Sequence, residues 1–322
     1  MKIVAVLGAL AGLLVAVAGV AAPAGQGQPR LIQIPFAPPL DQELHYELTS
    51  SKTSPTKSST TKITEILRFS RVSDKYVLTI NMTRLSNGVQ SFDLASPSGM
   101  AAVPPEWRPF LLPVSLDVGT DGALLRVRDW PRLQRALAEF PQMMAAAAKS
   151  PEDRKTMLSI GQNVVRPFAS LSAEQAPSVV LKGWPAFFGY GGAELEEGEE
   201  YEAENMTAGT LLPVAIPVVQ RLSIARDENG KLRYRQVTTR DSKQVSKAVE
   251  AYVRGLGDGL DAAGRENLEK AATAMNGMNI EDHLDITFHP TSGLVETAKS
   301  ERRISMGALG TGSEILQVSK LD

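Results

Sequence analysis

Apolar and polar residues alternate along much of the first half of the chain. Leu44, Tyr46 and Leu48 occupy every second position and are separated by charged residues or histidine. A period of two is typical of a strand that buries one face. The region 41–127 is therefore predicted to be rich in strands.

Turn residues separate strand-like segments at three points. Asp121-Gly122, the sequence Asp-Glu-Asn-Gly at 227–230 and Ser292-Gly293 each lie between two apolar segments. Such residues favour the tight turns of β-hairpins. Strands joined by hairpins are antiparallel, so an antiparallel sheet is expected both in the first half and after Tyr201.

Helical periodicity marks the middle of the chain and a later segment. Helices are predicted near 130–166 and 243–275, where apolar residues recur every three or four positions. Ser150 and Pro151 supply the cap and the first residue typical of a helix start. A second helix in the first of these regions is therefore expected to begin at Pro151.

Together these elements predict an α+β fold: a curved, mainly antiparallel β-sheet of about ten strands covered by helices. Residues 40–322 are expected to form a single β-rich domain, because no long Gly, Ser or Pro linker divides them. Similar residues recur at an offset of 155 or 156 positions, which suggests an internal duplication with halves 40–180 and 195–322. Chance similarity between amphipathic strands explains this recurrence equally well.

The N-terminus has the layout of a secretory signal peptide. An N-terminal lysine precedes an uncharged apolar stretch over 3–20, and small residues follow. Cleavage near Ala21 or Ala24 would remove a signal peptide of residues 1–24 and leave 25–39 as a flexible N-terminal segment. A retained anchor is the alternative, since roughly 18 apolar residues can just span a bilayer. With cleavage, we expect a periplasmic or secreted bacterial protein without a transmembrane segment.

Composition excludes several function classes. The 322 residues include 34 basic and 36 acidic side chains, which gives a formal charge of −2 and no basic surface for nucleic acid. The chain has no cysteine, so disulfides, thiolate metal sites and cysteine nucleophiles are absent. No cofactor is expected, because Gly189-Tyr190-Gly191-Gly192 lacks the last glycine of a dinucleotide-binding loop.

Catalysis is not expected either. A serine hydrolase would need one of the three histidines as its base, and the chain contains no Gly-x-Ser-x-Gly motif. The best metal candidates are His283 and Asp285, which would share one face of a strand with His289. His283 and His289 would lie about 20 Å apart on that strand, too far to bind one ion. A polar, solvated strand face is the simpler interpretation, and no metal site is predicted.

An acidic run spans Glu194 to Glu204, with seven carboxylates in eleven residues. On a strand, most of these charges would face one way and protect an exposed sheet edge from pairing. A Ca²⁺ site or a basic partner is the alternative, because carboxylate oxygens suit Ca²⁺. The run lacks the loop spacing of an EF-hand, which favours the edge interpretation.

The most unusual segment is the aromatic loop, residues 184–192. It contains four of the chain's 18 aromatic residues within nine positions, and its Pro and Gly residues exclude a regular helix. Packing within the core explains such a loop. The functional alternative is the wall or lid of an apolar pocket for a lipid-like ligand. On that hypothesis the ligand-binding residues are Trp184, Phe187, Phe188 and Tyr190.

The signal peptide, the amphipathic strands and the Asp-Gly hairpin turns resemble those of uncharacterised exported β-rich proteins of Gram-negative bacteria. The order of element types also resembles that of the periplasmic lipoprotein carriers, although no motif supports this and no functional residue is carried over. The sequence thus favours an exported, non-catalytic binding protein that shelters an apolar ligand or segment. One alternative is a structural or assembly partner of envelope proteins that acts through its sheet edges. The other is a hydrolase whose site the sequence does not show.

Overall fold

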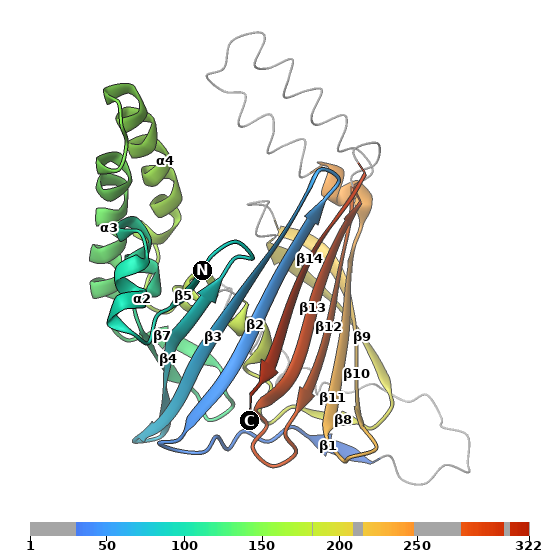
Figure 1. The fold of residues 1–322 in the computed structure, drawn as a ribbon. Coiled ribbons are helices and arrows are strands. Elements are labelled where there is room, and N and C mark those ends of the chain that lie inside the picture. Colours follow the sequence, from blue (N-terminus) through green and yellow to red (C-terminus); the bar gives the residue numbers. More distant parts are fainter. Residues whose placement is uncertain (1–29, 182, 209–214, 248–277, 306–309, 322) are drawn as a thin grey trace.

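The computed structural model describes residues 30–181, 183–208, 215–247, 278–305 and 310–321. Its main feature is one large, open sheet of twelve strands, in which every pair of neighbouring strands is antiparallel (Figure 1). The strand order is β7-β6-β4-β3-β2-β14-β13-β12-β11-β10-β9, and β5 pairs with β4 beside this path. The mainly antiparallel sheet is confirmed, and it is larger than the ten or so strands expected.

The strands fall into two consecutive runs that meet in the middle of the sheet. The first run consists of β2 (Glu43–Ser54), β3 (Lys57–Val72), β4 (Lys75–Ser86), β5 (Ser91–Asp93), β6 (Val114–Val118) and β7 (Leu124–Val127). The second consists of β9 (Glu200–Ala208), β10 (Ala215–Arg226), β11 (Leu232–Arg240), β12 (Asn279–Phe288), β13 (Val295–Ser305) and β14 (Thr311–Lys320). Pairing of β14 with β2 joins the two runs into one sheet. Each run is a meander in chain order, but the predicted duplication stays a prediction.

All three expected hairpins are present. Asp121-Gly122 connects β6 to β7, residues 227–230 connect β10 to β11, and Ser292-Gly293 lies between β12 and β13. At Gly122, Gly230 and Gly293 the backbone φ is positive, between 65° and 81°. Glycine adopts this conformation without the steric cost of a side chain, so the turn residues fix these hairpins locally.

Helices lie within the first run of strands, between β5 and β6, and also between the two runs. They are α2 (Pro97–Ala102), the 3-10 helix η1 (Pro105–Leu111), α3 (Trp130–Ala146), α4 (Pro151–Ala169), α5 (Pro177–Val180) and the 3-10 helix η2 (Trp184–Phe187). Helices α3 and α4 pack against each other and stand beside the β4–β7 end of the sheet (Figure 1). Ser150 caps α4 as expected, since its hydroxyl accepts a hydrogen bond from the Asp153 backbone N–H at 3.0 Å. Among the described residues, no helix has the length and apolar character needed to cross a bilayer.

The two predicted helical regions are described to different extents. A helix begins at residues 242–247, but most of the segment 243–275 lies outside the described residues. The predicted cover of helices over the sheet is therefore not established. The expected helical region 130–166 is divided into α3 and α4, and α4 continues to Ala169.

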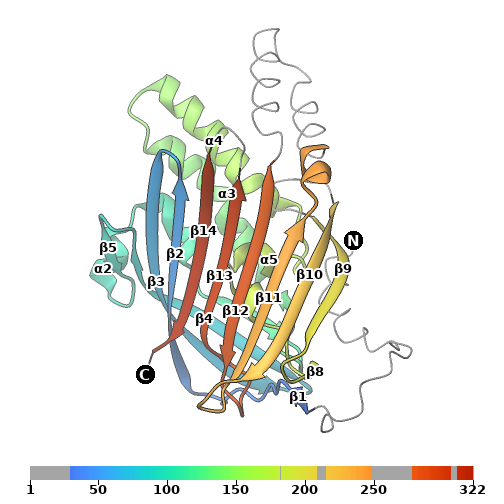
Figure 2. The same ribbon diagram turned by 90° about the vertical axis from the view of Figure 1, so that its right-hand side faces the viewer.

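A small second sheet lies at the end of the large one (Figure 2). It pairs β1 (Leu31–Gln33) with β8 (Glu194–Glu196). The segment 25–39 was expected to be flexible, yet its described part buries Ile32 and Ile34 in the main core. This pairing holds it in place. The predicted signal peptide, residues 1–24, lies outside the described residues.

The acidic run does not form one strand. Gly198 has φ of +84° and separates β8 from β9, so the carboxylates are divided between the two sheets. Among the described strands, β9 pairs only with β10 and ends the large sheet. There the Arg221 side chain donates a hydrogen bond to Glu202 at 2.8 Å. The acidic strand β9 is thus an edge strand of the described sheet.

Candidate functional site

A cavity of about 660 Å³ lies between strands β2–β4 and the helical segments. Such a volume falls within the range of about 300–1,000 Å³ found for ligand pockets. One wall is formed by apolar side chains of the sheet: Leu48, Ile63, Ile80, Met82 and Leu85. The opposite wall comes from the proline-rich segment 104–113, α3, α4 and α5, and includes Phe110, Leu111, Leu112, Trp130, Leu133, Leu137, Phe168, Val180 and Leu181.

The polar side chains that line this cavity are few. Thr61, Asn87 and Gln90 are neutral, and Asn87 and Gln90 are exposed. Both belong to the turn that connects β4 to β5. Exposed Trp107 of η1 also lines the cavity. These exposed residues indicate that the cavity opens to solvent near the β4–β5 turn and η1.

The base of the cavity contains its one ionisable side chain among the described residues. Glu65 of β3 is buried, and its carboxylate accepts a hydrogen bond of 2.6 Å from the indole N–H of Trp184. Burial raises the pKa of the Glu65 carboxyl, and the hydrogen bond from Trp184 opposes part of that rise. A carboxyl group in apolar surroundings is costly in its charged form, so this position is chemically distinct from the rest of the lining.

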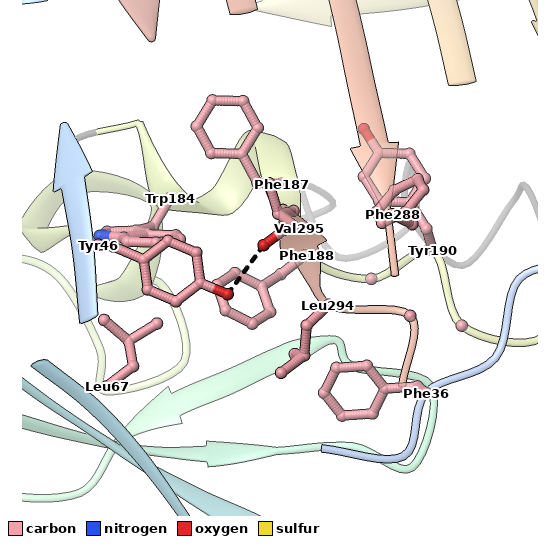
Figure 3. Close-up of a pocket in the computed structure, with 13 residues that line it drawn as sticks. Phe36, Tyr46, Leu67, Trp184, Phe187, Phe188, Tyr190, Phe288, Leu294 and Val295 are labelled. Atoms are coloured by element: carbon pink, nitrogen blue, oxygen red, sulfur yellow. Dashed lines mark hydrogen bonds between the residues drawn. The ribbon is translucent and has the colours of Figure 1, made fainter. Parts of the chain in front are cut away.

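Side chains of the aromatic loop fill the space that adjoins the base of the cavity. The Trp184 ring meets Tyr46 edge to face, with ring centroids 5.3 Å apart, and packs near Phe187 and Phe188 (Figure 3). The Tyr46 hydroxyl donates a hydrogen bond to the Val295 carbonyl at 2.8 Å. Only about 10 Å³ of free space remains among these side chains, which is at the lower limit of what one water molecule needs. This part of the loop is a packed core.

The four residues predicted to bind a ligand therefore have different positions. Trp184 lines the large cavity and is 2% exposed. Phe187, Phe188 and Tyr190 line the filled space beneath it instead. Tyr190 packs against Tyr234 and Phe288, with ring centroids 5.0 and 5.5 Å away. The structure brings all four together, but only Trp184 faces the cavity.

The weak metal candidates are already paired with other side chains. The Asp285 carboxylate is bound by Arg233 and also lies 3.5 Å from Arg235. The His283 imidazole contacts the carboxylate of Glu281 on the same strand. In the part of the chain that the structure describes, no cluster of three or more histidine or acidic residues could hold a metal ion.

Sequence reasoning missed most of the cavity lining. The segment 104–113 has four prolines in ten positions, and it contains Trp107 and Phe110. Its apolar side chains could have indicated that this segment forms part of a pocket wall. Glu65 gave a weaker indication, because it lies between Ile63 and Leu67 on the apolar face of β3. A charged residue at an inward position of an amphipathic strand is unusual and marks a candidate site.

Comparisons of the chain with protein-family models and with curated protein sequences find no match. The candidate site therefore rests on its own geometry.

Proposed function

We propose that this protein is an exported, non-catalytic binding protein that shelters an apolar ligand or apolar segment in the cavity between β2–β4 and the helical segments. The observation that supports this proposal is a cavity of about 660 Å³ with an apolar lining and few polar groups. Ligand pockets typically combine such a lining with a small number of polar groups that fix orientation. The signal-peptide pattern at residues 1–24 supports export to the periplasm or medium, where a carrier of poorly soluble ligands would act.

The tryptophans make this proposal directly measurable. The chain contains three, and Trp107, Trp130 and Trp184 all line the cavity. An uncharged fluorescent probe such as N-phenyl-1-naphthylamine absorbs where tryptophan emits. We expect saturable binding of this probe, accompanied by quenching of the tryptophan emission through energy transfer.

Two matched double variants test the location of the probe. Ile63→Trp with Leu85→Trp places two indoles side by side in the cavity wall, since these residues face each other across β3 and β4. Ile66→Trp with Asn81→Trp makes the same change at a paired position outside the lining. With the probe excited directly, the first variant should weaken binding at least ten-fold and the second less than two-fold. Absence of saturable binding, or equal losses in both variants, would refute the proposal.

Native mass spectrometry of protein purified from its own host tests the same proposal without an artificial probe. We expect a co-purified apolar molecule whose mass disappears in the variant with the filled cavity. A bound molecule that persists in that variant would place the ligand elsewhere.

A further inference from the structure

The cavity has one charged position, and this position constrains the ligand. Glu65 lies opposite Tyr46 on β2 and Met82 on β4, at the closed end of the cavity. It is 7% exposed. No lysine, arginine or histidine lines the cavity among the described residues. The closed end therefore offers a ligand hydrogen-bond acceptors and, when Glu65 is ionised, negative charge.

The only hydrogen bond that the described residues make to the Glu65 carboxylate comes from a neutral group, the Trp184 indole. No described cation forms an ion pair with it. A buried carboxylate without a cation is strongly disfavoured, whereas one paired with a cation and hydrogen bonded is tolerated. A ligand that carried its own cation to this position would supply the missing partner.

A ligand carboxylate would meet the opposite situation. It would approach ionised Glu65 as a like charge, without a lysine or arginine in the described lining to balance it. The polar residues near the mouth, Thr61, Asn87 and Gln90, are neutral and can bond to head groups of either sign. These neutral residues do not favour a ligand of either charge. A preference for the amine over the acid would therefore indicate contact with Glu65.

Building on the proposed function, we propose that the cavity selects amphiphiles whose polar group donates hydrogen bonds, a primary ammonium above all, and that Glu65 receives this group. The alkyl chain then lies along the apolar walls toward the mouth. An ammonium at Glu65 gains a charge-assisted hydrogen bond in a site of low dielectric, where such bonds are strong.

The test is displacement of N-phenyl-1-naphthylamine by three amphiphiles of equal chain length: dodecylamine, dodecanol and dodecanoate. All are used at neutral pH and below their micelle concentrations. In the unmodified protein, dodecylamine should displace the probe at a concentration at least ten-fold lower than dodecanoate, with dodecanol between them.

Glu65→Gln keeps the shape of the side chain and an acceptor for Trp184 but removes the charge. It should reduce the preference for amine over acid to less than three-fold while leaving the affinity for the uncharged probe unchanged. Glu47→Gln is the matched control, because Glu47 is a half-exposed glutamate on the neighbouring strand outside the cavity. It should retain the full preference.

Failure of this inference can be told apart from failure of the proposed function. If the probe binds but the amine and the acid displace it equally, or if Glu65→Gln leaves the preference intact, the assignment of Glu65 is overturned and the cavity stands. If the probe does not bind to the unmodified protein, both proposals are overturned.

Discussion

Replacement of Phe187 by alanine distinguishes a structural role of the aromatic loop from a direct role in binding. Phe187 is 2% exposed, and its ring meets Trp184 edge to face with centroids 6.3 Å apart. Only about 10 Å³ of free space adjoins it, so neighbouring side chains have little room to reach a new arrangement without leaving a cavity. Removal of a buried phenylalanine ring in such surroundings costs about 3–5 kcal/mol of the free energy of unfolding.

Thermal unfolding followed by circular dichroism measures this loss. In a chain of this size, 1 kcal/mol corresponds to roughly 2 °C, so Phe187→Ala should lower Tm by about 6–10 °C. Val89→Ala is the control, because Val89 is 92% exposed and should change stability by less than about 0.5 kcal/mol. Under conditions where the variant remains folded, its affinity for N-phenyl-1-naphthylamine should stay within two-fold of the original. A stability loss below about 1 kcal/mol together with lost probe binding would refute the core assignment and favour direct ligand contact.

Three further substitutions test other parts of the fold. Gly183→Ala should lower the free energy of unfolding, measured in urea, by at least about 1–2 kcal/mol, since φ is +89° and the new Cβ would overlap a leucine of β14. Gly192→Ala should lower it less, because the space around its Cβ is open. Ser150→Ala should lower stability by about 1 kcal/mol through loss of the cap of α4, and an unchanged urea midpoint would contradict this. A hydrogen bond from Arg303, which has the largest effect, and one from a neighbouring lysine lower the pKa of Glu301 from 4.5 to about 2. The ionised carboxylate therefore stabilises the fold above pH 4.5, and this contribution is lost as pH falls toward 2; an NMR titration midpoint near 4.5 would contradict the assignment.

Local sequence determined the secondary structure and its turns. The alternation of Leu44, Tyr46 and Leu48 gave β2 its buried face, because successive side chains of a strand point to opposite sides. Asp121-Gly122 fixed a hairpin through the backbone freedom of glycine, and Ser150 fixed the start of α4 through a hydrogen bond three residues away. These features depend on neighbours in the chain, so a single sequence is enough to find them.

Other features depended on contacts between distant residues. The sequence showed an aromatic loop but not which of its side chains would face open space. Glu65 and Trp184 are 119 positions apart, and only the fold places the indole N–H against the buried carboxylate. The pairing of β14 with β2 likewise joins the two ends of the described chain. A cavity is space left between elements after they pack, so no local pattern encodes it. The tertiary structure therefore decided that Trp184 lines a cavity while Phe187 fills the core beneath it.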